Sequence, residues 1–202
     1  MRILAIETAT EACSIALFDQ GQLIDARHEV LGRGHAERLV PMIAELPEKG
    51  HAEQIRISLG PGSFTGVRIG LAVARALGVA WKIPVRGYPT LALVAAMARA
   101  GTERAVTVCM TGGHGEWFVQ DFGTDGMPLD DVASLSPDTA AMRRTQDILA
   151  GTRAEDLSAM IGVASAPIIL PNASYALLVP DALLRDQLSP LYGRAPDAKL
   201  PM

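Results

Sequence analysis

The chain has 202 residues, enough for one large domain or two small ones, and its 49% hydrophobic and 20% charged residues are ordinary for a globular protein. Its net charge of −4 and the lack of a basic run argue against a protein that binds nucleic acid alone, because such proteins neutralise phosphates with clustered Lys and Arg. There is no signal-peptide pattern and no apolar run of about 18 residues. Two isolated cysteines, Cys13 and Cys109, favour a reducing compartment. We therefore expect a cytoplasmic protein without a membrane span.

The first hundred residues predict strands and helices in the order βββαβαβα. Apolar runs bounded by turn signals predict strands at 2–7, 12–18, 22–29, 54–59 and 83–87. Apolar residues at helical spacing predict helices at 35–46, 65–81 and 90–100, with Pro41 inside the first. Strands that alternate with helices are typical of an α/β fold in which helices cover a mixed sheet.

The pattern weakens in the second hundred residues. We expect strands at 105–110, 117–122, 132–135, 148–151 and 167–170, and helices at 137–144 and 172–178. The polar, Pro-rich segment 192–202 is expected to be irregular. The sequence thus predicts an α/β chain in two parts, residues 1–100 and residues 101–202.

A glycine-rich loop, 60–66 (GPGSFTG), joins a predicted strand to a predicted helix. Such a loop can present backbone N–H groups to an anion, or it can be a tight turn with a positive-φ glycine and a Ser or Thr N-cap. Both interpretations stay open, although the absence of a following lysine excludes a Walker A loop. If the loop holds an anion or a nucleotide, the candidate residues are Glu7, Thr8, Gly62, Ser63, Thr65 and Gly66.

No catalytic or metal-binding residue is predicted. Glu7 ends the first strand, where a carboxylate can orient a phosphate-bound metal or water, or can simply be solvated. None of the four histidines has the spacing of HExxH, and no GxSxG nucleophile motif occurs. The sequence therefore gives no support to a hydrolase triad or a metal site.

The predicted helix 65–81 is apolar on nearly all sides. At about 100° per residue, Gly66, Gly70, Ala74 and Gly78 fall along one side. A helix of this kind needs cover on two sides, and a stripe of small residues lets another helix come close. The second cover is either another helix of this chain or a partner protein. If it is a partner, Ala74→Arg should abolish pairing while the lone chain stays folded.

Several segments together resemble the TsaB (YeaZ) family. They are RILAIETAT at 2–10, ACS at 12–14, GHAE at 34–37, GPGSFTGVRIG at 60–70, PLYGR at 190–194 and PDAK at 196–199. The 60–70 segment matches the signature of that family. The resemblance is strong over residues 1–100 and thin over 101–190.

The resemblance implies an actin-like, ribonuclease-H-type fold, with an N-terminal lobe at 1–100 and a shortened C-terminal lobe at 101–202. It implies a non-catalytic subunit that pairs with TsaD and joins the ATPase TsaE. That complex transfers threonylcarbamoyl to N6 of the adenosine beside the anticodon of tRNA. This chain would hold no cofactor, would contact tRNA only indirectly, and would form a homodimer when alone. The family pairs through its first two helices, which here predicts an interface at Leu39, Met42, Ile43, Leu46, Val67, Gly70, Leu71, Ala74 and Gly78.

One departure bears on the alternative functions. Residues 111–114 read TGGH where the family has an Asp-Ala-Arg segment. A small nucleotide-binding ATPase or kinase of the same fold superfamily remains the alternative, although paired glycines at 112–113 lack a preceding acid. The older glycoprotease label of the family finds no nucleophile or metal motif to support it.

Overall fold

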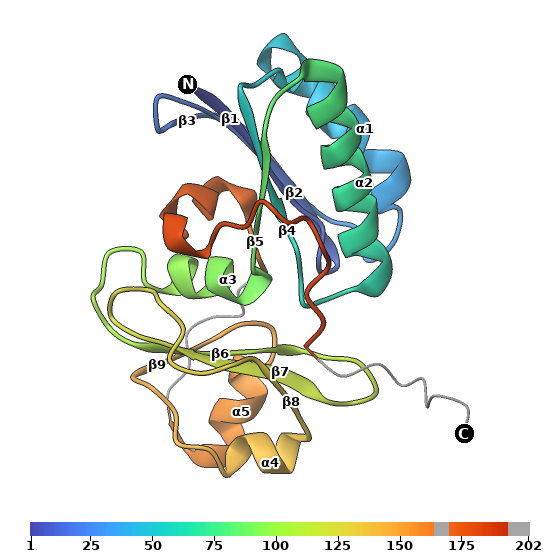
Figure 1. Cartoon of the computed structure of the whole chain (residues 1–202). Helices are drawn as coiled ribbons and strands as arrows, with labels where there is room; N and C mark the ends of the chain where they lie inside the picture. Colours follow the sequence, from blue (N-terminus) through green and yellow to red (C-terminus); the bar gives the residue numbers. More distant parts are fainter. Residues whose placement is uncertain (164–169, 194–202) are drawn as a thin grey trace.

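The first lobe is built on a five-stranded mixed sheet (Figure 1). The computed structural model of the chain describes residues 1–163 and 170–193. The strand order is β3-β2-β1-β4-β5, in which β1 pairs antiparallel with β2 and parallel with β4. The strands are β1 (Arg2–Glu7), β2 (Ala12–Asp19), β3 (Gln22–Val30), β4 (Gln54–Ser58) and β5 (Val85–Tyr88).

Helices cover both faces of this sheet. α1 (His35–Glu45) and α2 (Phe64–Trp81) pack on the face formed by Leu4 and Ile6 of β1. α3 (Thr90–Ala98) packs on the opposite face, formed by Ile3 and Ala5. Because successive side chains of a strand point to opposite faces, the uninterrupted apolar run of β1 supplies both cores. A short 3-10 helix, η1 (Pro47–Gly50), follows α1.

The second lobe is a four-stranded sheet that shares α3 with the first. Its order is β8-β7-β6-β9, and α3 packs between the two sheets, so that Leu91 and Val94 share a core with Val106 and Phe122. α4 (Pro137–Ala141) and α5 (Ala154–Ile161) cover the outer face. The strands are β6 (Val106–Thr111), β7 (Trp117–Phe122), β8 (Ala133–Leu135) and β9 (Ile148–Ala150).

The chain returns to the first lobe after the second. The 3-10 helices η2 (Ala173–Leu178) and η3 (Asp181–Leu183) pack on the first sheet, and Arg56 Nη2 of β4 donates to Asp181 Oδ1 at 2.9 Å. Leu191 N–H donates to Leu59 O at 2.7 Å. The expected division at residue 101 therefore needs correction, because residues 172–191 bury apolar side chains against the first sheet.

The structure confirms the predicted α/β class and differs in several elements. α5 was not predicted, since it is only eight residues long and its N-cap, Arg153, makes no capping bond. The helix expected at 137–144 ends at Ala141, and the one expected at 172–178 is a 3-10 helix. The strand expected at 167–170 falls largely outside the described residues, as does most of 192–202.

A buried carboxyl lies at the end of β1. The side chain of Glu7 is fully buried, and its Oε1 accepts a hydrogen bond from Ala9 N–H at 2.6 Å. Its Oε2 has no hydrogen-bond partner among the described residues. Burial raises the pKa of this carboxyl to about 7, against the opposing effect of the Ala9 N–H.

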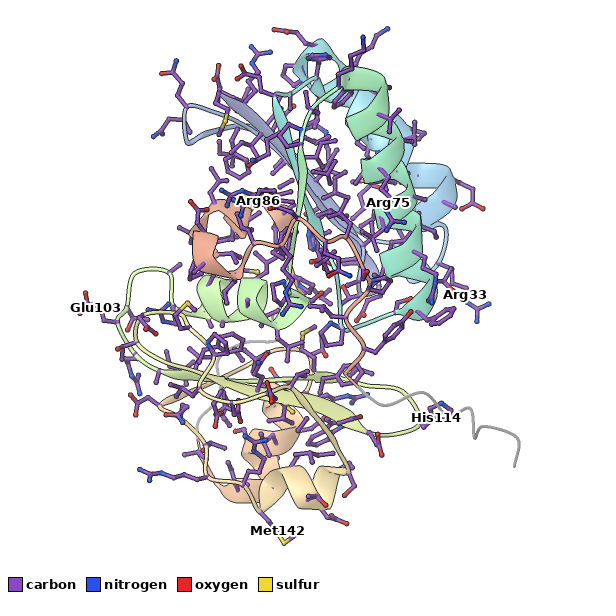
Figure 2. All side chains as sticks on the ribbon, viewed as in Figure 1. Arg33, Arg75, Arg86, Glu103, His114 and Met142 are labelled. Atoms are coloured by element: carbon purple, nitrogen blue, oxygen red, sulfur yellow. The ribbon has the colours of Figure 1, made fainter. Side chains whose placement is uncertain are left out.

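The Glu7 carboxyl should make stability depend on pH. Its pKa is raised on folding, from 4.5 to about 7, so the folded state binds more protons and stability falls as pH rises across that window. Glu7→Gln should remove this slope, which amounts to roughly 2 kcal/mol between about pH 5 and pH 8. Urea unfolding at several pH values measures the slope. Glu103→Gln, a change on the surface (Figure 2), is the matched control, and a slope that Glu7→Gln leaves unchanged would contradict the assignment.

Candidate functional site

The glycine-rich loop is a tight turn that connects β4 to α2. Gly60 has φ of 88°, a conformation that favours glycine, and Ser63 is the N-cap of α2, where its Oγ accepts from Gly66 N–H at 3.2 Å. Ser63 N–H donates to Ala9 O at 2.6 Å, which ties the loop to the β1–β2 turn. The turn interpretation of the loop is therefore confirmed.

Three further glycines let α2 and its loop lie against the β1–β2 turn. A Cβ added at Gly62 would lie 2.1 Å from Ala9 O, and one at Gly66 would lie 2.1 Å from Thr8 O. At Gly70 the nearest atom would be Thr8 Oγ1, at 2.3 Å. No side chain fits at these distances, so the small side of α2 faces the sheet of its own chain.

The residues predicted to bind a partner lie on the side of the two helices that faces the chain's own sheet. The predicted set of interface residues therefore needs correction. The periodicity identified two apolar sides of α2, but it could not tell which of them covers the sheet. Ala74 has no exposed surface, so we now expect Ala74→Arg to disrupt the fold of the lone chain. All nine residues are buried within this chain: Leu39, Met42, Ile43, Leu46, Val67, Gly70, Leu71, Ala74 and Gly78.

The opposite side of both helices forms an exposed apolar surface, here called the outer face. Val79 is 81% exposed and Val40 is 53% exposed. α2 is long and apolar enough to cross a membrane, yet only 33% of it is buried in this chain. Between residues 69 and 81 its single charged residue is Arg75. The exposed apolar residues of the outer face are Ala36, Val40, Pro41 and Ala44 of α1, and Ala72, Ala76, Val79 and Ala80 of α2.

Two polar cavities flank the glycine-rich loop. The interlobe cavity has a volume of about 430 Å³ and is lined by Thr10 and Ser63 from the first lobe and by Gly113 and Thr152 from the second. The other cavity, of about 510 Å³, lies between the first turns of α1 and α2. Charged side chains also line both, Glu11 in the interlobe cavity and Arg33 and Glu37 in the other.

The six candidate anion-binding residues do not form one site. Gly62 and Ser63 line the interlobe cavity, while Ser63, Thr65 and Gly66 line the cavity between the helices. Glu7 and Thr8 line neither, and both are fully buried. The Thr8 hydroxyl donates to Gly66 O at 2.8 Å, so the structure uses it to hold the loop.

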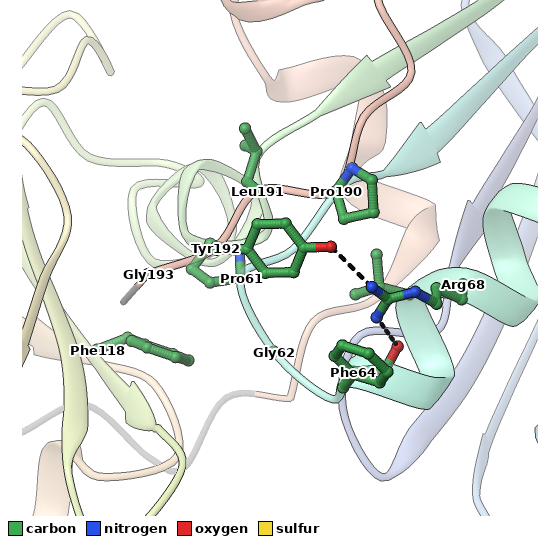
Figure 3. A pocket seen from close by; sticks show the side chains of 10 residues that line it. Pro61, Gly62, Phe64, Arg68, Phe118, Pro190, Leu191, Tyr192 and Gly193 are labelled. Atoms are coloured by element: carbon green, nitrogen blue, oxygen red, sulfur yellow. Dashed lines mark hydrogen bonds between the residues drawn. The ribbon is translucent and has the colours of Figure 1, made fainter. Parts of the chain in front are cut away.

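A third pocket was missed from the sequence. It lies where the two lobes meet, beside the first turn of α2, and its aromatic residues come from three distant segments: Phe64, Phe118 and Tyr192 (Figure 3). Arg68 of α2 completes its rim. The loop and the segment 190–194 were recognised only as family motifs, and no local pattern shows that they meet.

The described residues include no group of three or more His, Cys, Asp or Glu side chains that could hold a metal ion. Burial raises the pKa of the Cys13 thiol to about 11 and that of Cys109 to about 12, so neither is a thiolate near neutral pH. The TGGH segment forms the turn after β6, closed by Gly112 N–H donating to Glu116 O at 2.8 Å. It supplies backbone rather than acidic side chains to the interlobe cavity.

Comparisons with known proteins agree with this architecture. The family model described as TsaD: tRNA N6-adenosine threonylcarbamoyltransferase matches residues 27–142, more than half of the chain. TsaB of Escherichia coli K12, a tRNA threonylcarbamoyladenosine biosynthesis protein, is 42% identical over 100 residues, which cover 47% of this chain and 43% of that protein. An uncharacterised protein of Mycobacterium tuberculosis H37Rv is 30% identical over 208 residues, 98% of this chain and 93% of its own.

A solved structure of YeaZ from Pseudomonas aeruginosa superposes with a TM-score of 0.79 at 28% identity, covering 95% of this chain and 99% of that one. The alignments to the curated TsaB proteins of E. coli and Haemophilus influenzae span less than half of their length, 43% and 44%. The expected actin-like α/β fold is confirmed by the YeaZ superposition. The family model covers more than half of the chain, two TsaB proteins are 42% and 38% identical over about half of it, and YeaZ superposes over 95% of it, so the chain belongs to the TsaB (YeaZ) family.

Proposed function

We propose that this chain is a non-catalytic partner subunit that pairs, through the outer face of α1 and α2, with a TsaD-like catalytic subunit in the synthesis of threonylcarbamoyladenosine on tRNA. The exposed apolar outer face carries the proposal. Apolar surface of this extent on a soluble lobe marks a contact with another protein. The E. coli relative is named for the same pathway.

The outer face has the shape that close helix packing needs. Ala72, Ala76 and Ala80 recur at i, i+4 and i+8, so they form a row on the exposed side of α2. A row of small side chains lets a second helix approach closely. The small-residue stripe that faces a partner is therefore this alanine row, while the glycine stripe faces the sheet.

The other proposed properties follow from the same arrangement. A second copy can cover the outer face when the chain is alone, because a two-fold contact uses the same patch on both copies. We assign ATP hydrolysis to a TsaE-like partner and the main hold on tRNA to the catalytic subunit, since this chain has a net charge of −4. The chain would then act in the cytosol as a scaffold without a cofactor.

Two arginine substitutions on α2 separate pairing from folding. Ala76→Arg places a charge on the exposed row and should abolish pairing with the TsaD-like protein while the lone chain stays folded. Ala74→Arg places it in the buried core and should unfold the chain. Circular dichroism reports folding, and size-exclusion chromatography with light scattering reports pairing. A folded Ala76→Arg chain that still pairs would rule out the outer face.

A second candidate function is a nucleotide hydrolase that uses the interlobe cavity. The volume of that cavity and its position between the two lobes favour nucleotide binding there. The buried carboxyl of Glu7, however, does not line the cavity. A carboxylate that orients a phosphate-bound metal must contact that metal or its water.

An assay of phosphate release from magnesium ATP tests the hydrolase. We expect no release above buffer from the lone chain. Gly113→Asp tests the cavity directly. Gly113 lines the cavity and a Cβ there meets nothing within 4 Å, so the chain should accept a carboxylate that repels a bound phosphate. Release that scales with protein concentration and falls in Gly113→Asp would establish the hydrolase and refute the non-catalytic role.

A further inference from the structure

The pocket at the junction of the lobes is lined by flat rings. Phe64 begins α2 and is 66% exposed, and Tyr192 is 58% exposed. Phe118 of β7 lies on the opposite side from Arg68, and Pro61 and Pro190 also line the pocket (Figure 3). The cavity volume is about 100 Å³, which suits a single flat ring system and is too small for a helix.

Arg68 holds the exposed rings in place. Its guanidinium carbon lies 3.3 Å from the centroid of Phe64 and 5.8 Å from that of Tyr192. Nη2 donates to Tyr192 Oη at 2.7 Å and Nη1 donates to Phe64 O at 3.2 Å. These contacts leave other N–H donors of Arg68 without an acceptor in the described part of the chain. The rings are thus preorganised next to a cation that retains donor capacity.

The charges around the pocket are unbalanced. Within residues 1–163 and 170–193, no carboxylate lies within 4.0 Å of Arg68, Arg75 or Arg33. Arg75 lies on the same helix as Arg68, and Arg33 lies near its first turn (Figure 2). By contrast, Arg38 is paired with two carboxylates and Arg56 with one. Arg33 shares its cavity with Glu37, so the positive charge beside the exposed aromatic rings comes from Arg68 and Arg75 of α2.

We propose that this pocket binds one unstacked nucleobase, with Arg68 donating to the neighbouring phosphate. A base presents a flat ring with an anionic group beside it, which matches aromatic rings beside an unpaired guanidinium. A peptide would need an apolar ring and a carboxylate from two different side chains, whereas a nucleotide carries a flat ring and an anion in one unit. The source of the base is a free nucleotide or an unpaired nucleotide of RNA, and only the RNA source rests on the proposed function.

The geometry also orients the nucleotide. Glu11 lies on the interlobe cavity, on the other side of the Pro61–Gly62 turn from Arg68. A phosphate placed toward that cavity would meet the Glu11 carboxylate, whereas a phosphate placed along α2 would meet Arg68 and then Arg75. We therefore assign the phosphate to the α2 side of the pocket.

Binding of two probes to the 202-residue chain tests this site. A labelled unstructured heptanucleotide RNA is titrated by fluorescence anisotropy, and AMP by isothermal calorimetry. Phe64→Ala and Tyr192→Ala should each weaken binding about fivefold or more, the loss expected for removing one stacking ring. Phe64→Leu keeps the apolar surface and should weaken binding similarly. Arg68→Ala should also flatten the dependence of log K on log salt for RNA by about 0.7.

Leu129→Ala is the matched control, because Leu129 is 60% exposed and lies on the second lobe. Binding of RNA but not AMP, with the expected sensitivity, assigns the site to RNA, and equal sensitivity with both probes assigns it to a mononucleotide. Binding of neither probe, or binding that the ring variants leave unchanged, overturns the proposal. Ring variants that instead weaken only the pairing with a TsaD-like protein also overturn it, and assign the pocket to the protein interface.

The two proposals fail independently. A folded Ala76→Arg chain that no longer pairs should bind RNA as the unsubstituted chain does, because Ala76 is more than two helical turns from Arg68. Loss of nucleobase binding in Phe64→Ala with intact pairing would in turn leave the subunit role standing.

Discussion

The close contact between α2 and the turn of the first hairpin is the constraint on which the rest of the structure depends. Gly62, Gly66 and Gly70 leave no room for a side chain against Thr8 and Ala9. This contact sets the depth at which α2 lies on the sheet and the rotation of the helix about its axis. Because the glycine side must face inward, the alanine row must face outward. The apolar outer face is thus a consequence of how the loop packs.

The first sheet is buried on both faces, and a different set of elements covers each face. One face lies under α1 and α2, and the other lies under α3 and the returning segment 172–191. Since α3 also packs on the second sheet, the two lobes share a continuous core. The outer face is therefore carried by helices packed on a sheet that is buried on both faces, while the interlobe cavity and the aromatic pocket lie along the junction of the lobes.

The returning segment explains why the aromatic pocket exists. Leu191 pairs with Leu59 just before the glycine-rich loop, and this brings Tyr192 over the first turn of α2. The described part of the second family motif, residues 190–193, is thereby adjacent in space to the first motif at 60–70, although more than a hundred residues separate them. Their contact depends on residues 172–191 burying apolar surface on the first sheet.

The sequence by itself determined the α/β class, the order of elements over residues 1–100 and the two-sided apolar character of α2, and it limited the N-cap of that helix to a Ser or a Thr. These properties are local, because periodicity, turn chemistry and caps act over a few residues. Only the tertiary structure decided which side of α2 covers the sheet, that Glu7 is sealed from the interlobe cavity, and that the chain returns to its first lobe. Each of these depends on contacts between residues distant in the chain, where the burial of apolar surface and the room for a Cβ decide the outcome.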